Sequence, residues 1–334
     1  MTTVSIIVPC RNEKNYIEAF LASVAMQDYP SKFIEIILVD GMSNDGTYRL
    51  VEKLEIPNLK LLQNEKKYVS NALNLAINNS TGHVILRMDV HCNYPINYVS
   101  ELVNYIINNP NVGSVGGRSV TLPGNDTFDA KIIALAGSTR FGVGNSIFRI
   151  SKTDEIIQAD TVPLGCWRRS IFDIVGYFDT DLIRNQDDEF HQRLIKHGFE
   201  IHLMGSLKID YFARKTLTSN SWMYFQYGLF KPSVNKKLSK ITTLRQLAPL
   251  LLLIYLASVI IGSLLLPNIS LIAFMIIILL YLGASFFTLM SSELQFSIKA
   301  VVLLAFIVFL MHLSYGIGYV LGSIYMPRKL ALTR

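Results

Sequence analysis

The last quarter of the chain constrains its fold most, because it holds three long apolar segments that carry almost no charge. Residues 247–266, 269–290 and 298–324 are each about 20 residues or longer, and Pro267-Asn268 separates the first two. At a rise of about 1.5 Å per residue, such a helix crosses a hydrocarbon core about 30 Å thick. Residues 246–326 are therefore predicted to form a membrane region of about three helices. A pore or transporter is disfavoured, because the segments contain so few ionisable groups.

Basic residues border this region on both sides. Residues 221–245 join an aromatic, amphipathic stretch, Trp222–Phe230, to a run of bases. We interpret them as an interfacial linker that meets anionic lipid headgroups, with a surface helix packed on the preceding domain as the alternative. A basic tail, residues 327–334, follows the last segment. Three crossings from a cytoplasmic front would place this tail outside, which conflicts with the positive-inside tendency. Either the basic tail is tolerated on that side, or one of the three segments is interfacial or re-entrant.

Charge and cysteine content indicate which cellular compartment and which classes of binding partner to expect. The formal net charge is +6, yet no basic stripe interleaved with aromatic residues occurs in residues 1–230, so no nucleic-acid partner is expected. Cys10, Cys92 and Cys166 are odd in number and widely spaced, which favours a reducing compartment over a disulfide framework. The first residues lack the basic-then-apolar pattern of a secretory signal. We therefore expect a multi-pass membrane protein whose catalytic domain stays on the cytoplasmic side.

The front part, residues 1–220, alternates apolar strands with amphipathic helices. Val4–Pro9, Ile34–Val39 and Val84–Met88 read as buried strands, and each is followed by a polar loop. This alternation predicts an α/β domain with a mostly parallel central sheet and a ligand crevice at the carboxyl ends of its strands. Residues 123–144 look loop-rich and weakly patterned, which suits a lid or a substrate-shaping insertion.

Asp89 and His91 stand at the end of the predicted strand Val84–Met88. Their side chains, two positions apart, point to the same side and could take two coordination sites on one divalent cation. Water and a diphosphate would fill the remaining sites. The alternative for these two residues alone is a polar turn with a satisfied histidine.

Three further acidic residues, at two places in the chain, have both a functional and a structural interpretation. Asp40 ends the strand Ile34–Val39, where it could contact a base or ribose, or else form an Asx turn in a loop whose Asp45 caps the next helix. Asp187 and Asp188 begin a predicted helix. They could serve as a general base for a nucleophilic hydroxyl, or merely stabilise the first turn through the helix dipole.

Taken in order, these motifs resemble the family 2 glycosyltransferases of GT-A fold. The resemblance extends over about residues 4–230, and within the family the chain is most similar to the succinoglycan-biosynthesis ExoA-like branch. The matching segments are Val8-Pro-Cys-Arg-Asn-Glu13, Val39-Asp-Gly-Met-Ser-Asn-Asp-Gly-Thr47, Asn71 to Asn74, Arg87-x-Asp89-x-His91, Arg184-Asn-Gln-Asp-Asp-Glu189 with Arg193-Leu194, and Phe225-Gln-Tyr-Gly228.

The resemblance implies a role for each matching position. A nucleotide-sugar donor would be bound by Pro9, Arg11, Glu13, Asp40, Asn71, Asn74, Arg87 and Asp89, with Asp40 on the uracil or guanine. Asp89 and His91 would hold Mg²⁺ or Mn²⁺ on the donor diphosphate. Asp187 matches the catalytic aspartate of the family, and Asp188 is the second choice.

Three departures from the family pattern bear on these roles. Gly41 replaces a commonly acidic residue, His91 replaces a carboxylate, and Gln186 replaces a glutamate beside the presumed base. The imidazole is a softer ligand than a carboxylate, so we expect the site to accept Mn²⁺ as well as Mg²⁺. The Gln-x-x-Arg-Trp signature of processive synthases is absent around Gln226, so transfer of a single sugar is expected.

The resemblance thus implies an inverting enzyme of cell-surface or exopolysaccharide synthesis. It would move one sugar from a nucleoside-diphosphate sugar to a lipid-linked saccharide or to a polyprenyl phosphate. A polyprenyl-phosphate sugar synthase is the alternative with the same chemistry. The alternatives from other classes are a metal-dependent nucleotidyltransferase and a non-catalytic membrane scaffold. The first usually needs a basic, glycine-rich phosphate loop near the N-terminus, which Cys10 to Asn15 does not supply. The second has no need of acidic groups at three strand or helix ends.

Overall fold

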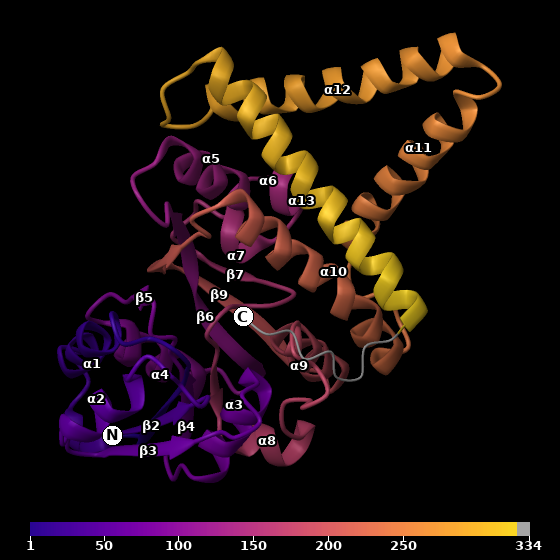
Figure 1. Ribbon diagram of the computed structural model, residues 1–334. Helices are drawn as coiled ribbons and strands as arrows, with labels where there is room; N and C mark the ends of the chain where they lie inside the picture. Colours follow the sequence, from indigo (N-terminus) through magenta and orange to yellow (C-terminus); the bar gives the residue numbers. More distant parts are fainter. Residues whose placement is uncertain (326–334) are drawn as a thin grey trace. The chain divides into compact units, whose positions relative to one another are not determined.

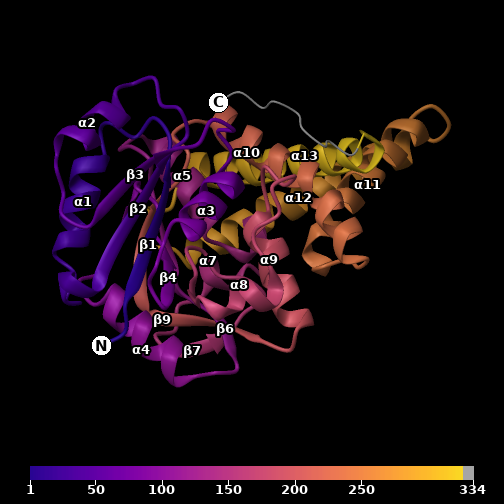
Figure 2. The ribbon, with the colours of Figure 1, turned by 90° about the horizontal axis from the view of Figure 1, so that it is seen from below.

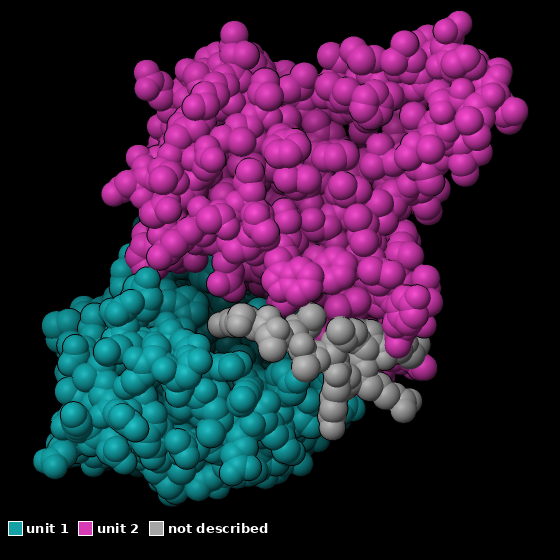
Figure 3. Space-filling model, viewed as in Figure 1, with its two compact units in different colours: residues 1–120, 151–211 teal, residues 121–150, 212–334 magenta. Residues whose placement is uncertain are grey.

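Four parallel strands form one side of the sheet in the first of the two units of the chain. The computed structural model describes residues 1–325, and its units comprise residues 1–120 with 151–211, and residues 121–150 with 212 onward (Figure 3). The predicted division assigned 121–150 to the catalytic domain, whereas the structure groups them with the C-terminal helices. The predicted basic tail, residues 327–334, lies outside the described residues.

The first unit is an α/β domain, as its sequence predicts. Its helices are α1 (Ile17–Ala25), α2 (Thr47–Lys53), α3 (Val69–Asn78), α4 (Tyr98–Asn108), α8 (Ser170–Val175) and α9 (Gln186–Lys196). Its strands are β1 (Val4–Cys10), β2 (Ile34–Asp40), β3 (Leu59–Gln63), β4 (Val84–Arg87), β5 (Cys92–Asn93), β6 (Val112–Leu122), β7 (Ile156–Gln158), β8 (Cys166–Arg168) and β9 (Glu200–Phe212).

These strands form one sheet in the order β3-β2-β1-β4-β8-β6-β9-β5, and β7 pairs with β9. Strands β1 to β4 are parallel, with Cys10 opposite Asp40 and Ile7 opposite Arg87. The next strand, β8, runs antiparallel to β4. Since parallel strands end at the same edge, the register brings the polar loops after β1, β2 and β4 together.

Helices cover both faces of the parallel strands (Figures 1 and 2). Alternate residues of β1, such as Ile6 and Val8, pack with the apolar sides of α1 and α4. Helix α3 lies against β1 and β2 on the other face. Strands buried on both sides need continuous apolar runs, and the sequence of β1 and β2 supplies them.

The second unit is helical. It contains α5 (Phe128–Gly137), α6 (Arg140–Val143), α7 (Ile147–Ile150), α10 (Leu217–Leu238), α11 (Ala248–Gly262), α12 (Pro267–Met290) and α13 (Ile298–Tyr325). Three helical stretches, Leu244–Gly262, Pro267–Met290 and Ile298–Tyr325, are long and apolar enough to cross a membrane. These are close to the predicted segments. The first ends earlier, at Gly262, and Pro267 starts the second at a position where its missing N–H costs no helical hydrogen bond.

Helix α10 packs along α13 at very short backbone separation. A Cβ atom added to Gly228 of α10 would collide with the carbonyl oxygen of Tyr315, and one added to Gly318 with that of Phe225. Glycines permit such close approach between helices in membranes. The predicted aromatic stretch Trp222–Phe230 is thus part of a longer helix, which continues through Pro232 into the basic run.

Residues 123–144 differ most from their predicted form. They contain α5, which the Thr127 side chain caps by accepting a hydrogen bond from the Ala130 backbone N–H. Ile132, Ile133 and Ala136 of α5 are buried in one cluster with α10 and α13. The apolar partners lie about 90 residues or more downstream, so the local pattern alone did not reveal this helix.

Candidate active site

The loops after β1 and β2 are joined side by side at the carboxyl edge of the sheet. The backbone N–H of Asn12 donates to Ser43 Oγ at 2.8 Å, and that of Asn44 donates to Asn12 Oδ1 at 3.0 Å. The N–H of Glu13 likewise donates to Thr47 Oγ1 at 2.9 Å. These reciprocal bonds fix both loops, so the backbone around Arg11 and Glu13 is held in place before any ligand arrives.

Asp40 is buried at the start of the second loop. One carboxylate oxygen accepts the backbone N–H of Ser43 at 2.9 Å, and the other accepts the Ser43 hydroxyl. Asp45 in turn accepts the N–H of Thr47 at 2.9 Å and that of Lys14 at 3.1 Å. Asp40 therefore stabilises its own loop through Ser43, three residues on, while the Asx turn is made by Asp45, which bonds the N–H of Thr47 two residues on. A base contact by Asp40 stays a prediction.

Arg11 lies against Gly41. A Cβ atom built on Gly41 would stand 3.3 Å from Cβ of Arg11 and 3.4 Å from its Cδ. A larger residue at position 41 would therefore press on the arginine stem. The departure from the acidic residue common at this position thus has a packing consequence, since it leaves room for Arg11. Pro9, which pairs with Val39 in the sheet, is half-buried just below.

Glu13 meets His91 across the edge of the sheet. Oε1 of Glu13 lies 3.3 Å from Nδ1 of His91, which links the loop after β1 to the segment after β4. Tyr94 holds that segment in place, because its hydroxyl accepts the backbone N–H of Asp89 at 2.7 Å and lies 3.1 Å from the Asp89 carbonyl oxygen. No sequence motif points to this role of Tyr94, because it depends on the way the chain folds back on Asp89.

Arg87 brings Asp89 and Asp187 into one site. Its Nε lies 2.9 Å from Oδ1 of Asp89 and its Nη2 3.1 Å from Oδ2. Its Nη1 lies 2.8 and 2.9 Å from the two carboxylate oxygens of Asp187. Burial opposes the charged form of Arg87, yet the two carboxylates, Asp187 foremost, raise its pKa above the ordinary value. The Arg87 guanidinium therefore holds together Asp89 and Asp187, which are 98 positions apart in the sequence.

An aromatic core supports the helix that carries Asp187. Phe190 of α9 packs against Phe178 with ring centroids 4.6 Å apart and against the edge of Trp167 at 5.9 Å. Arg193 pairs with Glu189 at 2.6 Å and also donates to the Val175 carbonyl at 2.6 Å. The helix start is consequently rigid, which favours a fixed position for the Asp187 carboxylate.

His191 lies one turn after Asp187 and is fully buried, and the sequence analysis did not single it out. Its Nδ1 lies 2.9 Å from Thr161 Oγ1, and its Nε2 lies 3.0 Å from Ser114 Oγ. Burial lowers its pKa, and the nearby carboxylates of Asp187 and Asp188 counteract part of that effect. A neutral imidazole between two hydroxyls therefore fastens α9 to the sheet.

The two asparagines of α3 have different surroundings. The Asn74 side chain donates to the Phe178 carbonyl at 2.8 Å and accepts the Phe178 N–H at 3.0 Å. Its amide is thus used in holding the segment before α9. Asn71, one turn earlier, is half-buried. Donor contacts by these residues remain predictions. Asp188 follows Asp187 in the first turn of α9 and is also half-buried.

The residues present fit a divalent cation only together with a phosphate ligand. Within residues 1–325, no three His, Cys, Asp or Glu side chains gather into a ready-made metal cluster. Asp89 and His91 would contribute one oxygen and one nitrogen, with Glu13 next to the imidazole. Mg²⁺ and similar cations are commonly held by one or two protein groups plus substrate phosphates. A cation held by Asp89 and His91 would therefore need a diphosphate to complete its coordination, and the assignment of these two ligands stays a prediction.

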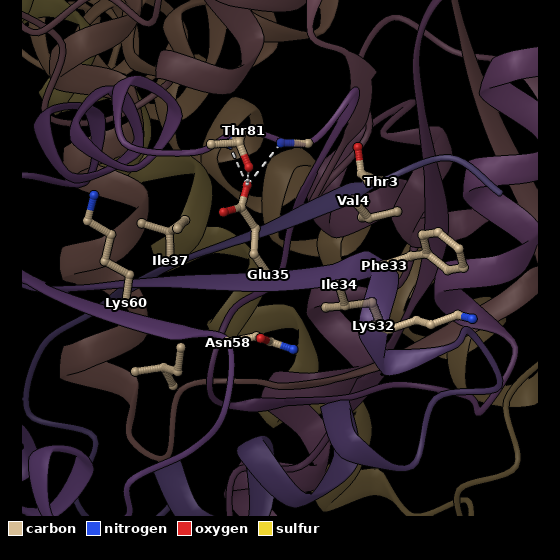
Figure 4. A pocket seen from close by; sticks show the side chains of 12 residues that line it. Thr3, Val4, Lys32, Phe33, Ile34, Glu35, Ile37, Asn58, Lys60 and Thr81 are labelled. Carbon is tan, nitrogen blue, oxygen red and sulfur yellow. Dashed lines mark hydrogen bonds between the residues drawn. The ribbon is translucent and has the colours of Figure 1, made fainter.

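A separate hollow lies at the opposite edge of the same strands (Figure 4). It has a volume of about 400 Å³, and Val4, Ile34 and Leu59, the first residues of their strands, line it. Glu35 stands in it with its carboxylate bound by the backbone N–H of Gly82 at 2.9 Å and by the Ser5 and Thr81 hydroxyls. The acidic residues of the candidate site follow the carboxyl ends of the strands, whereas this hollow lies at their amino ends. The hollow is therefore not part of the candidate site.

Comparison with known proteins identifies the family. The family model for glycosyl transferase family 2 matches residues 5–172. The succinoglycan biosynthesis protein ExoA of Rhizobium meliloti is 29% identical over 257 residues, which cover 75% of each chain. A dolichyl N-acetyl-alpha-D-glucosaminyl phosphate 3-beta-D-2,3-diacetamido-2,3-dideoxy-beta-D-glucuronosyltransferase of Methanococcus voltae is 29% identical over 71% of this chain and 75% of its own.

Solved structures agree with the fold. The mannosyltransferase PcManGT of Pyrobaculum calidifontis, solved with GDP-Man and Mn²⁺, has a TM-score of 0.60 at 20% identity and covers 91% of this chain and 86% of its own. GalNAc-T7, solved with UDP, GalNAc and Mn²⁺, has a TM-score of 0.51 at 16% identity and covers 70% of this chain. The predicted GT-A type fold is thereby confirmed. With the family motifs in sequence order and its fold in place, the chain belongs to glycosyl transferase family 2 and is a glycosyltransferase that uses a nucleotide sugar.

Proposed function

We propose that this enzyme transfers one sugar, with inversion, from a nucleoside-diphosphate sugar to a hydroxyl of a lipid-linked saccharide or to a polyprenyl phosphate. The observation that carries the proposal is the shared contact of Asp89 and Asp187 with Arg87. It joins the strand end that would bind the donor diphosphate to the helix start that would hold the base. An enzyme of this class needs both groups in one site.

The donor end of the site would be built on the loops after β1, β2 and β4. Arg11 and Glu13 stand on a loop fixed by the bonds of Asn12 and Glu13 to the next loop. Asp89 and His91 would hold Mg²⁺ or Mn²⁺ on the donor diphosphate. That cation, when bound, offsets the negative charge that builds on the leaving diphosphate. The protein's part is to present the oxygen of Asp89 and the imidazole of His91 from a segment clamped by Tyr94.

Asp187 would serve as the general base. With a hydroxyl acceptor, its carboxylate takes the hydroxyl proton while the oxygen attacks the anomeric carbon opposite the leaving group. A polyprenyl phosphate, which is already ionised near neutral pH, would attack through its phosphate oxygen without that proton transfer. Attack from that side inverts the anomeric configuration. The rigid start of α9, supported by Phe190 and Arg193, keeps the carboxylate in place. Asp188 is the second candidate, because it occupies the same helical turn.

The membrane unit supports a lipid-linked acceptor. Three of its helical stretches are long and apolar enough to cross a membrane, and Lys236 and Lys237 lie in the last turn of the helix that precedes them. Basic side chains there suit anionic lipid phosphates. The M. voltae relative is named for a dolichyl-phosphate-linked substrate, and the R. meliloti relative for succinoglycan biosynthesis. We place the catalytic unit on the cytoplasmic side, where nucleotide sugars are made.

The test is a transfer assay with the detergent-purified full chain. A panel of UDP- and GDP-sugars, each with Mg²⁺ or Mn²⁺, is incubated with polyprenyl phosphate or with lipid extracts, and products are identified by mass spectrometry. We expect one donor to yield a lipid product carrying a single added sugar. The anomeric configuration of that product, read by NMR, should be opposite to that of the donor. A retained configuration would rule out direct displacement assisted by Asp187.

A further inference from the structure

Arg87 binds only carboxylates among the residues that the structure describes, whereas Arg193 divides its hydrogen bonds between the Glu189 carboxylate and backbone carbonyls. The guanidinium of Arg168 donates to backbone carbonyls, including Ile106 at Nη1 and Val112 at Nη2. In the described part of the chain, all four hydrogen bonds of the Arg87 side chain go instead to carboxylates, those of Asp89 and Asp187. Backbone carbonyls stay where the fold puts them. Carboxylates can exchange partners when a second cation arrives.

The charges around Arg87 do not balance. Its side chain is 8% exposed, and it faces two carboxylates whose side chains are 22% and 31% exposed. The guanidinium cannot lose its positive charge by deprotonation. The single positive charge of Arg87 thus neutralises only one of the two carboxylate charges. A divalent cation at Asp89 would compete directly with Nε and Nη2 of Arg87 for the two Asp89 oxygens.

We propose that Arg87 is a positioning residue that couples cation binding at Asp89 to the placement of the base Asp187. Without donor, the guanidinium is divided between the two carboxylates. With a cation bound at Asp89, Arg87 would lose that partner and keep Asp187, whose carboxylate it would then hold in place. The inference rests on the proposed function. It gives Arg87 a role beyond the donor binding that the family resemblance implies for it.

Competition has a consequence that a purely structural role lacks. If Arg87 only supported the fold, its loss would weaken cation binding and transfer together. If it competes with the cation, Arg87→Gln should bind Mn²⁺ more tightly while transferring sugar more slowly. Asp187→Asn should have the opposite effect on the cation, because the guanidinium then has Asp89 as its remaining carboxylate partner. Coupling between linked sites is commonly fivefold or more in affinity.

The experiment measures Mn²⁺ affinity of the detergent-purified full chain from the electron paramagnetic resonance signal of the free ion. Titrations are run with Mn²⁺ alone and with added UDP or GDP. We expect about fivefold tighter binding in Arg87→Gln and about fivefold weaker binding in Asp187→Asn. Arg87→Lys, which keeps the charge but loses the planar fork, should lie between the wild type and Arg87→Gln.

Two controls separate coupling from misfolding. Arg168→Gln removes an equally charged side chain that binds backbone, and it should lower stability without tightening Mn²⁺ binding. If Arg87→Gln does not fold, the double variant Arg87→Gln with Asp187→Asn removes opposite charges together, and it should bind Mn²⁺ more tightly than Asp187→Asn alone. Unchanged or weaker Mn²⁺ binding on loss of Arg87 in either comparison would overturn the inference.

Failure of this inference is distinct from failure of the proposed function. An enzyme that transfers sugar and binds Mn²⁺, but whose affinity for the ion does not rise on loss of Arg87, retains the function and loses the coupling. A wild type that binds no Mn²⁺ under any of these conditions also overturns the coupling, because nothing then competes for Asp89. Absence of transfer with every donor counts against the function itself.

Discussion

Oε1 of Glu13 lies 3.3 Å from Nδ1 of His91, although the two residues are 78 positions apart. The contact ties the loop after β1 to the segment after β4. It therefore places a carboxylate beside the imidazole that stands where the family usually has an acid. Glu13, which follows another strand, thus supplies near position 91 the negative charge that an acid at that position would have supplied.

Exchanging the imidazole for an oxygen ligand should change which cation supports activity. Oxygen ligands suit Mg²⁺ better than imidazole does, so His91→Asp should raise the rate with Mg²⁺ relative to the rate with Mn²⁺. Initial rates of transfer with each ion measure this ratio. Because the new acid would face Glu13, the double variant with Glu13→Gln serves as the control for charge repulsion. An unaltered ratio in both variants would remove His91 from the cation site.

Asp187→Asn should abolish most turnover while leaving the fold intact. Losing a general base typically costs on the order of 100-fold or more in rate. The variant should still fold with at most a modest loss of thermal stability, because the buried Arg87 guanidinium keeps Asp89 as a charged partner. Asp188→Asn, in the same helical turn, is the matched control. If it loses the larger share of turnover, the base is Asp188 and the assignment from the family register is wrong.

The two asparagines of α3 should respond differently to alanine. Asn74→Ala removes two hydrogen bonds to the backbone of Phe178, so we expect a loss of about 1–3 kcal/mol in the free energy of unfolding. Asn71→Ala should stay within about 0.5 kcal/mol, as is usual for partly exposed sites. Chemical denaturation of both variants measures the difference. Equal stabilities would mean that the Asn74 bonds contribute little to the fold.

The buried histidine on α9 should make the protein sensitive to acid. Burial lowers the pKa of His191 below its ordinary value of 6.5, so the folded state favours the neutral ring. The stabilisation is complete above pH 6.5 and is lost as the pH falls below that value, because the unfolded chain binds the proton more readily. Unfolding measured from pH 8 to 5 should show this decline. His191→Gln, which cannot titrate, should show a smaller decline even if it is less stable at pH 8.

The contact between α10 and α13 should tolerate no added side chain at its glycines. Gly318→Val would drive a side chain into the backbone of Phe225, and we expect a destabilisation of about 1–3 kcal/mol or more. Gly283 of α12 has nothing within 4 Å of an added Cβ, so Gly283→Val is a matched control in another apolar helix. Thermal stability of the two variants in detergent provides the comparison. Equal loss in both would argue that helix propensity, rather than packing, determines the effect.

Local sequence was enough to predict the strands and the apolar helices. β1, β2 and β4 are short runs with apolar residues on both faces, and that pattern is typical of buried parallel strands. The three apolar helices follow from segment length and the scarcity of charge. The ordered motifs from Pro9 to Arg193 also predicted the family, because their residue types and their order along the chain match the family pattern.

Only the tertiary structure decided which of these residues meet. The shared hold of Arg87 on Asp89 and Asp187 depends on how β4 and α9 pack, and no pattern within a few residues encodes it. The same is true of His191 between Thr161 and Ser114, and of α5, whose apolar side is completed by α10 and α13. Periodicity and composition report on neighbours along the chain. Partners distant in sequence are chosen by packing of the whole core, because a buried charge or polar group must find its counterpart wherever the fold provides one.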